Sequence, residues 1–201
     1  MVTQTGLFDD LQNMVPTMPE GFRYEEDIIS EAEEASLVAL LALLELKPFE
    51  FHGHVGNRRV TSFGLRYDYA RRTVETADGF PSFLTDLRNK VAAFAGRKVH
   101  EFQQGGVNEY PPGAGIGWHK DRPQFGAIVG VSLLAPATMR LRLSSDKSWI
   151  RKSQEVKPRS IYILDGEART RWEHSIPPVN SLRYSLTFRT LAMGQKSYAS
   201  S

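Results

Sequence analysis

The stretch GIGWHKDRPQFG, residues 115–126, decides how the rest of this chain is interpreted. It continues the turn-forming run YPPGAGIG and places His119 and Asp121 two positions apart. In an extended backbone, side chains at positions i and i+2 point to the same side. The imidazole and the carboxylate would then converge on one point, as a metal site, a hydrogen-bonded pair or a polar loop.

Segments beyond residue 98 alternate short apolar runs with turn residues. Their β-branched and aromatic residues, and the alternation in RLRL and RYSLTFR, predict strands. The predicted strands are 128–134, 138–143, 160–164 and 182–189. Several short strands at this spacing predict a mainly β fold, a sandwich or barrel of the jelly-roll kind.

The first half of the chain predicts two helices. Ser30 and Glu33 form a capping box ahead of a helix at 31–47, which Pro48 would end. A second helix is expected over 81–96, with proline at its start and glycine at its stop.

Composition bounds the class of protein. The chain has 201 residues, 41% of them hydrophobic, which suits one domain with a sizeable core. The absence of cysteine excludes disulfides and cysteine-based metal sites. No secretory signal is visible, and the longest apolar run, 37–46, is too short to span a bilayer. We therefore expect a cytoplasmic protein without a membrane partner. Residues 1–24 lack periodicity and predict an irregular arm, and residues 50–75 predict short strands or a hairpin.

Charge is unevenly distributed although the net charge is only +2. Acidic residues crowd 20–34, and arginines crowd one later segment, at Arg58, Arg59, Arg66, Arg71 and Arg72. Such a basic patch could contact phosphates, or it could be an ordinary solvated surface.

His174, far along the chain in TRWEHSIPP, could complete a site with His119 and Asp121. Two histidines and one carboxylate suit a facial triad on Fe(II), whereas structural zinc usually takes four protein ligands. A histidine paired with its neighbour in a loop is the alternative.

The closing strand places Arg183 and Arg189 six positions apart and therefore on one face. They could bind a dicarboxylate through their guanidinium forks, or their stems could cover apolar surface. Asn108 and Tyr110 could add hydrogen bonds to the same ligand.

Four segments together resemble the AlkB family of Fe(II)- and 2-oxoglutarate-dependent dioxygenases: VNEYPPGAGIGWHKD, GVSLL, ARTRWEHSIPP and RYSLTFR. The resemblance covers roughly residues 55–190. It implies a double-stranded β-helix (jelly-roll) core with an N-terminal helical support and a nucleotide-recognition lid. The expected segments are an arm at 1–24, support and lid at 25–97, and the catalytic core at 98–195, all in one dioxygenase domain.

The resemblance also implies roles for individual residues. The motif positions imply Fe(II) ligation by His119, Asp121 and His174. They imply 2-oxoglutarate binding by Asn108, Tyr110, Arg183, Ser185 and Arg189. In the expected lid, the segment FGLRYDY implies base stacking by Tyr69 or, second, Tyr67, with packing of the lid on the core as the alternative. A nucleic-acid substrate would make phosphate contacts with Arg58 and Arg59. Trp118 is expected to pack beside the site or to be an ordinary core aromatic.

The implied reaction is oxidative dealkylation of N-alkylated bases in DNA or RNA. The expected partners are O₂ and single-stranded nucleic acid, and a monomer is expected. One departure concerns the base: Pro123 and Gln124 stand where repair members carry an acidic residue. A modified tRNA base or a protein side chain therefore remains an alternative substrate, and a non-catalytic binding module is a third interpretation.

Overall fold

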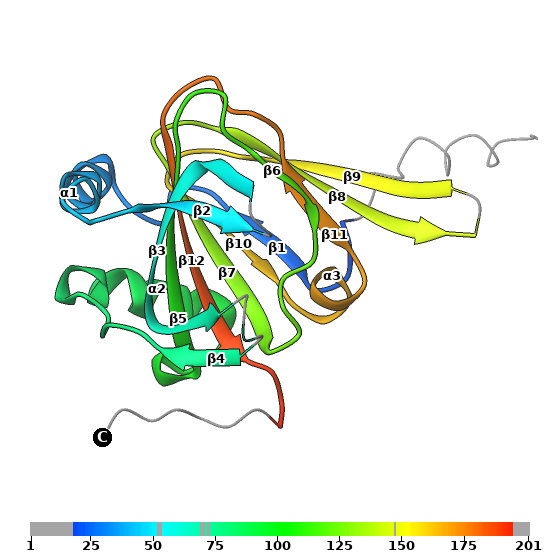
Figure 1. The fold of residues 1–201 in the computed structure, drawn as a ribbon, viewed down its shortest axis with the longest axis horizontal. Helices are drawn as coiled ribbons and strands as arrows, with labels where there is room; N and C mark the ends of the chain where they lie inside the picture. Colours follow the sequence, from blue (N-terminus) through cyan, green and yellow to red (C-terminus); the bar gives the residue numbers. More distant parts are fainter. Residues whose placement is uncertain (1–17, 52–53, 69–70, 72, 147, 195–201) are drawn as a thin grey trace, which may run out of the picture.

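Two antiparallel sheets face one another in the computed structural model, which describes residues 18–51, 54–68, 71, 73–146 and 148–194 (Figure 1). The larger sheet has the strand order β1-β10-β7-β12-β5-β3-β2, with β4 paired to β3, and the smaller has the order β6-β11-β8-β9. The predicted mainly β, jelly-roll architecture is confirmed.

The strands of the larger sheet are β1 (Phe22–Glu25), β2 (Lys47–Phe51), β3 (His54–Asp68), β4 (Thr73–Thr76), β5 (Phe102–Tyr110), β7 (Phe125–Leu133), β10 (Ser160–Leu164) and β12 (Arg183–Leu191). Those of the smaller sheet are β6 (Ile116–His119), β8 (Ala137–Ser145), β9 (Ser148–Val156) and β11 (Glu173–Ile176). The helices are α1 (Glu31–Leu41), α2 (Thr85–Ala95) and α3 (Gly166–Thr170), with short 3₁₀ turns at Ser82–Leu84 and Val99–Glu101. In the described parts of the chain, no helix has the length and hydropathy needed to cross a membrane.

Strand β12 shows how alternation positions the site. Tyr184, Leu186 and Phe188 are buried in the core between the larger sheet and the helices. The intervening residues, among them Arg183 and Arg189, line a cavity on the opposite face. Because successive side chains of a strand alternate between faces, one strand supplies both the core and the polar site.

Helix α1 ends six residues earlier than predicted. It stops at Leu41, and the next turn closes through hydrogen bonds from Leu43 to Leu40 and from Leu44 to Leu41. Pro48 does not end the helix but lies in β2, at the edge of the larger sheet. A proline is tolerated in an edge strand and pushes the residue before it into an extended conformation. Because the apolar run 37–46 continues past Leu41, no local sequence signal marks the end of the helix there.

One further expectation is corrected, and strand β9 was not predicted. Phe22–Glu25 is not irregular but forms β1, which pairs with β10; residues 1–17 of the expected arm lie outside the described part. Strand β9 carries mostly exposed side chains, so its sequence lacks the apolar face that marks other strands. The second helix matches its prediction: Gly96 ends α2 with φ 66°, a left-handed conformation that glycine adopts without strain.

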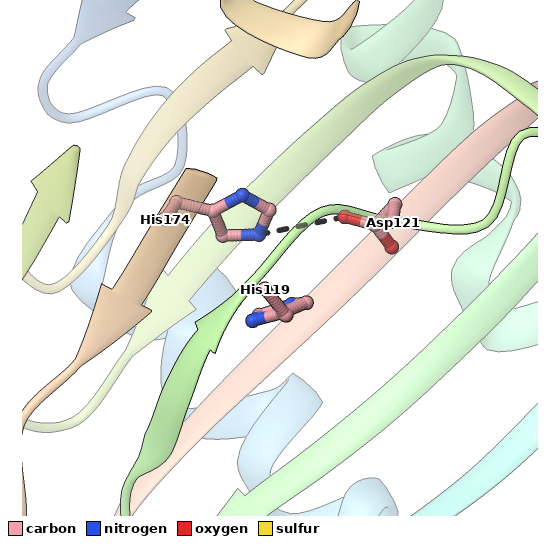
Figure 2. Close-up of side chains that lie close together, drawn as sticks. All are labelled: His119, Asp121 and His174. Carbon is pink, nitrogen blue, oxygen red and sulfur yellow. Dashed lines mark ion pairs between the residues drawn. The ribbon is translucent and has the colours of Figure 1, made fainter. Parts of the chain in front are cut away.

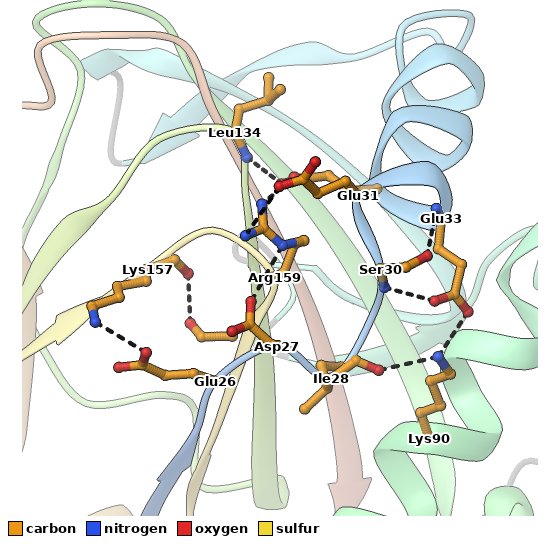
Figure 3. Close-up of polar contacts among 12 residues, drawn as sticks. Glu26, Asp27, Ile28, Ser30, Glu31, Glu33, Lys90, Leu134, Lys157 and Arg159 are labelled. Atoms are coloured by element: carbon orange, nitrogen blue, oxygen red, sulfur yellow. Dashed lines mark hydrogen bonds and ion pairs between the residues drawn. The ribbon is translucent and has the colours of Figure 1, made fainter.

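Glu34 ties α1 to two loops of the larger sheet. Its carboxylate accepts hydrogen bonds from the Leu134 amide, at 2.8 Å, and from Arg159 Nη1, at 3.2 Å. Leu134 and Arg159 both have positive φ, 70° and 62°, so each loop holds a conformation that is unfavourable for its residue. Figure 3 shows Arg159 between the start of α1 and Lys157, which directly follows β9. The buried carboxylate thus stabilises two strained turns at once.

Glu34→Ala is expected to lower the free energy of unfolding by about 2–4 kcal/mol, because it leaves the part-buried Leu134 amide without its acceptor and removes from Arg159 its most buried carboxylate partner. Chemical denaturation measures the change. Glu31→Ala is the matched control: Glu31 is 87% exposed and 3.9 Å from Arg159, so its loss should cost less than about 0.5 kcal/mol. Equal effects of the two substitutions would contradict a special role of Glu34.

Candidate metal centre and cofactor cavity

Two histidines and one carboxylate meet between the two sheets. The ligand atoms of His119, Asp121 and His174 all lie within 4.8 Å of one another. The two imidazole rings are 4.2 Å apart between centroids, and His174 Nε2 lies 3.4 Å from Asp121 Oδ2 (Figure 2). This donor set suits Fe(II) and leaves part of an octahedral coordination sphere to other ligands.

Backbone pairing brings the two histidines together. His119 ends β6, His174 lies in β11, and the two are direct partners in the antiparallel register. Gly115, just before β6, packs against the chain after β11: a Cβ there would lie 2.7 Å from the Ile176 carbonyl oxygen. Only glycine fits this approach, so the glycine-rich run before the motif sets the register of the site.

The Asp121 carboxylate is held ionised by an arginine. Arg189 donates to Asp121 Oδ1 through Nε at 3.1 Å and lies within 3.0 Å through Nη2. Burial by itself would raise the pKa of Asp121, but the positive charge of Arg189 holds it well below its usual range. The site therefore presents a permanent anion to a metal ion.

Both histidines are arranged so that a ring nitrogen can ligate a metal ion. Burial, reinforced by His119, lowers the pKa of His174 to about 3, so its ring is uncharged near neutral pH. His119 Nδ1 lies 2.9 Å from the Gly117 carbonyl oxygen. That contact favours a proton on Nδ1 and leaves Nε2 free to ligate.

The triad opens into a cavity of about 1190 Å³ between the sheets. Arg183 lies on its wall and is 1% exposed, yet its Nη1 has no hydrogen-bond partner among the described residues. Its Nε donates to Ser132 Oγ at 3.1 Å, and its guanidinium lies 5.2 Å from the Tyr110 ring centroid. Burying a guanidinium with an unsatisfied N–H lowers stability unless an anion accepts that hydrogen bond. One carboxylate of 2-oxoglutarate could be this acceptor.

The other residues expected at the cofactor occupy different parts of the cavity wall. Tyr110 and Ser185 are buried and line the cavity together with Arg183. Asn108 also lines it, but its side-chain oxygen accepts from Arg58 Nη1 at 3.1 Å. The Arg189 guanidinium contacts Asp121, as described, and its Nη1 donates to Gln104 and Thr187. Contact of Asn108 and Arg189 with 2-oxoglutarate stays a prediction.

The expected substrate residues divide into those at the cavity and those elsewhere. Trp118, Tyr67 and Arg58 line the cavity, and Arg58 stacks on the Phe49 ring at 3.8 Å. Tyr69, the first choice for base stacking, lies outside the described residues.

Arg59 is not among the described residues that line the cavity, and its contact with a phosphate stays a prediction. Its neighbour Arg58 faces the cavity, and successive residues of β3 point to opposite faces of the sheet. Arg59 instead forms a two-point ion pair with buried Glu109, with contacts of 2.7 and 2.9 Å. Tyr184 donates its hydroxyl proton to the same carboxylate at 2.9 Å. Burial, together with this hydrogen bond, raises the pKa of Tyr184 to about 12.

Arg169, which the sequence reasoning did not single out, holds the loop that follows Asp121. From α3 it donates to three main-chain carbonyl oxygens, of Arg122 at 2.6 Å, Phe125 at 2.7 Å and Gly126 at 3.0 Å. Burial lowers the pKa of its guanidinium, and Asp121 opposes that effect. Hydrophobic periodicity does not identify an arginine that binds main-chain atoms. The position of Arg169 in ARTRWEH, the segment that also contains His174, could have indicated a role near the site.

Arg169→Met is expected to weaken Fe(II) affinity by about tenfold, because the loop carrying Asp121 would lose its three hydrogen bonds. Competition with a fluorescent chelator measures the affinity. Arg171→Met, at an exposed arginine that pairs with Glu167 at 2.7 Å, is the control. Unchanged Fe(II) affinity in Arg169→Met would show that the loop carrying Asp121 keeps its position without the hydrogen bonds from Arg169.

Comparison with known families gives a match over most of the chain. A family model described as the 2OG-Fe(II) oxygenase superfamily matches residues 21–189. An Arabidopsis thaliana protein described as an alkylated DNA repair protein ALKBH8 homolog is 30% identical over 177 residues, 75% of this chain and 49% of the relative. The Mus musculus tRNA (carboxymethyluridine(34)-5-O)-methyltransferase ALKBH8 is 27% identical over 167 residues, 80% of this chain and 25% of that protein. The chain thus matches half or less of the length of these relatives.

A solved structure supports the fold. The structure titled "The structure of OsALKBH1" superposes with a TM-score of 0.66 and covers 87% of this chain and 98% of its own. Sequence identity between the two is 14%, so this likeness concerns the fold alone.

Proposed function

The chain belongs to the AlkB family of 2OG-Fe(II) oxygenases, dioxygenases that use Fe(II) and 2-oxoglutarate, and we propose that it oxidises a modified base in RNA, with tRNA as the first candidate. The observation that carries this proposal is the shared cavity. It combines the three metal-ligating side chains, a buried arginine with a free donor, and a wall bearing Tyr67, Trp118 and Arg58. A base could stack on an aromatic ring there.

Bound Fe(II) with 2-oxoglutarate supplies the oxidation: O₂ delivers one oxygen atom to succinate, formed with CO₂, and the other to a C–H bond of the substrate. The chain's own residues position the reactants. His119, Asp121 and His174 would hold the metal, and Arg189 would keep Asp121 ionised and oriented. Arg183 would fix one carboxylate of 2-oxoglutarate in a site shielded from water.

Two observations favour a tRNA base. Pro123 and Gln124 replace the acidic residue that the resemblance associates with reading an alkylated base in DNA. Several relatives, from mouse, Xenopus tropicalis and Macaca fascicularis, carry names that refer to carboxymethyluridine in tRNA. Their named methyl transfer is not part of the proposal, because this chain matches only about a quarter of each, 25%, 26% and 24%.

Removal of an N-alkyl group from DNA is the second candidate. The Arabidopsis relative is described as an alkylated DNA repair protein, which favours it. In that reaction the oxidised alkyl carbon leaves as an aldehyde and the base regains its N–H.

Succinate release with Fe(II) and 2-oxoglutarate in air, with each nucleic acid added in turn, tests these alternatives. The arms are total tRNA, an unmodified tRNA transcript, and single-stranded DNA carrying 1-methyladenine or 3-methylcytosine. Stimulation by native tRNA above the transcript supports the proposal. Stimulation by methylated DNA alone would replace it with the repair function, and stimulation by neither would overturn both.

A further inference from the structure

The smaller sheet has an outer face, directed away from the larger sheet, and among the described residues only its edge at Trp118 reaches the cavity described above. On β8, Met139 and Leu141 are buried in the core between the sheets. The alternate residues Arg140 and Arg142 therefore point outward. Strands β8 and β9 continue beyond the rest of the fold as a long hairpin (Figure 1).

Tryptophan and arginine side chains are stacked along this outer face. The Arg142 guanidinium lies 4.5 Å from the Trp118 ring centroid and 4.1 Å from that of Trp149. Arg140 lies 5.0 Å from the Trp118 ring. Trp149 is 38% exposed, although tryptophan is usually well buried. These contacts form an arginine–tryptophan row made of Trp118, Arg140, Arg142 and Trp149.

Positive charge accumulates beside this row. Arg151 on β9 is the direct cross-strand partner of Arg142, so two like charges face one another on the same side of the sheet. Like charges placed directly opposite destabilise a sheet. One carboxylate, Glu173, engages Arg142 at 2.6 Å, while Glu155 and Asp146 lie toward the two ends of the hairpin. An anion placed over Arg151 would relieve the repulsion.

The row leads directly to the proposed active site. Trp118 precedes the metal-ligating His119 and also lines the cavity. Arg140 donates to Ser175 Oγ at 3.1 Å, and Ser175 follows the metal-ligating His174. A strand of nucleic acid with one base in the cavity could thus continue across the outer face.

We propose that the outer face of the β6-β11-β8-β9 sheet binds the single-stranded segment of RNA next to the oxidised base. Trp149 stacks on an unpaired base, and Arg140 and Arg151 contact phosphates. This combination of aromatic platforms with cationic side chains is the general means of binding single strands. The proposal rests on the proposed function for the class of partner, and it adds a contact surface outside the cavity.

Fluorescence anisotropy of labelled tRNA and of a single-stranded RNA, titrated with the full chain at several salt concentrations, tests the surface. Arg151→Glu is expected to weaken binding by about tenfold and to lower the slope of log affinity against log salt by about 0.7. Trp149→Ala is expected to weaken binding by about fivefold or more, with little change in that slope. Arg151→Lys should bind nearly as the wild type, because it keeps the charge.

Lys98→Glu is the matched control, since it reverses an exposed charge next to α2, in the helical layer on the other side of the larger sheet. It should change affinity by less than about twofold. RNA-independent succinate formation should be unchanged in Arg151→Glu, which shows that the fold and metal site survive. Wild-type affinity in both Arg151→Glu and Trp149→Ala would overturn this surface while leaving the proposed function standing. Failure of the wild-type protein to bind either RNA would overturn both.

Discussion

His119→Ala is expected to reduce Fe(II)-dependent succinate formation by more than about a hundredfold. Loss of one imidazole leaves two protein ligands, and even the loss of a supporting contact typically costs metal sites 10–100-fold. The ring is partly exposed at the cavity and contributes little to the core, so the fold should persist. Fe(II) affinity and succinate formation, measured on the same preparation, should fall together.

His100→Ala is the control for this substitution. His100 is exposed, lies in the 3₁₀ turn Val99–Glu101 and takes no part in the metal-ligating group. Its replacement should leave succinate formation within about twofold of the wild type. Succinate formation that survives in His119→Ala would contradict the assignment of the triad.

Arg183→Met should weaken 2-oxoglutarate binding without lowering the stability of the fold. Removal of a charge that binds a buried anion typically costs 2–5 kcal/mol of binding, so KM for 2-oxoglutarate should rise by at least about thirtyfold. Without 2-oxoglutarate, the variant should be at least as stable as the wild type, because a buried guanidinium with an unpaired nitrogen is replaced by an apolar side chain of similar length. The thermal shift that 2-oxoglutarate causes in the wild type should disappear.

Arg159→Met provides the contrast. Arg159 pairs with Glu34, Asp27 and Glu31, far from the cavity wall, so its loss should lower stability without changing KM for 2-oxoglutarate. A marked loss of stability in Arg183→Met with unchanged KM would mean that Arg183 serves the core rather than the cofactor.

The sequence was informative where spacing determines geometry. His119 and Asp121 converge because they lie two positions apart in nearly extended chain, and Arg183 and Arg189, six positions apart, share a face of β12 for the same reason. The jelly-roll was predictable because most of its strands carry alternating or continuous apolar residues. These features depend on local periodicity, which can be recognised in a single sequence.

Features set by tertiary contacts could not be predicted in this way. Leu41 ends α1 inside an apolar run, and no local signal distinguishes it from the residues that follow. Neither Arg59 nor Arg169 reveals its partner in the sequence, since the partners lie 50 and up to 47 residues away. The two-point pairing of Arg59 with Glu109 lies outside the cavity, although its neighbour Arg58 reaches the cavity.

The most direct test of the whole account is to incubate the protein with Fe(II), 2-oxoglutarate and native tRNA under isotopically labelled O₂, and to analyse succinate and tRNA nucleosides by mass spectrometry. An oxygenase that acts on tRNA should place one labelled oxygen atom in each succinate and form an equal amount of one nucleoside that is hydroxylated or has lost an alkyl group. His119→Ala should give neither product. Succinate that forms without any change in tRNA or alkylated DNA would contradict a nucleic-acid substrate, and the absence of labelled succinate under all conditions would contradict the oxygenase site itself.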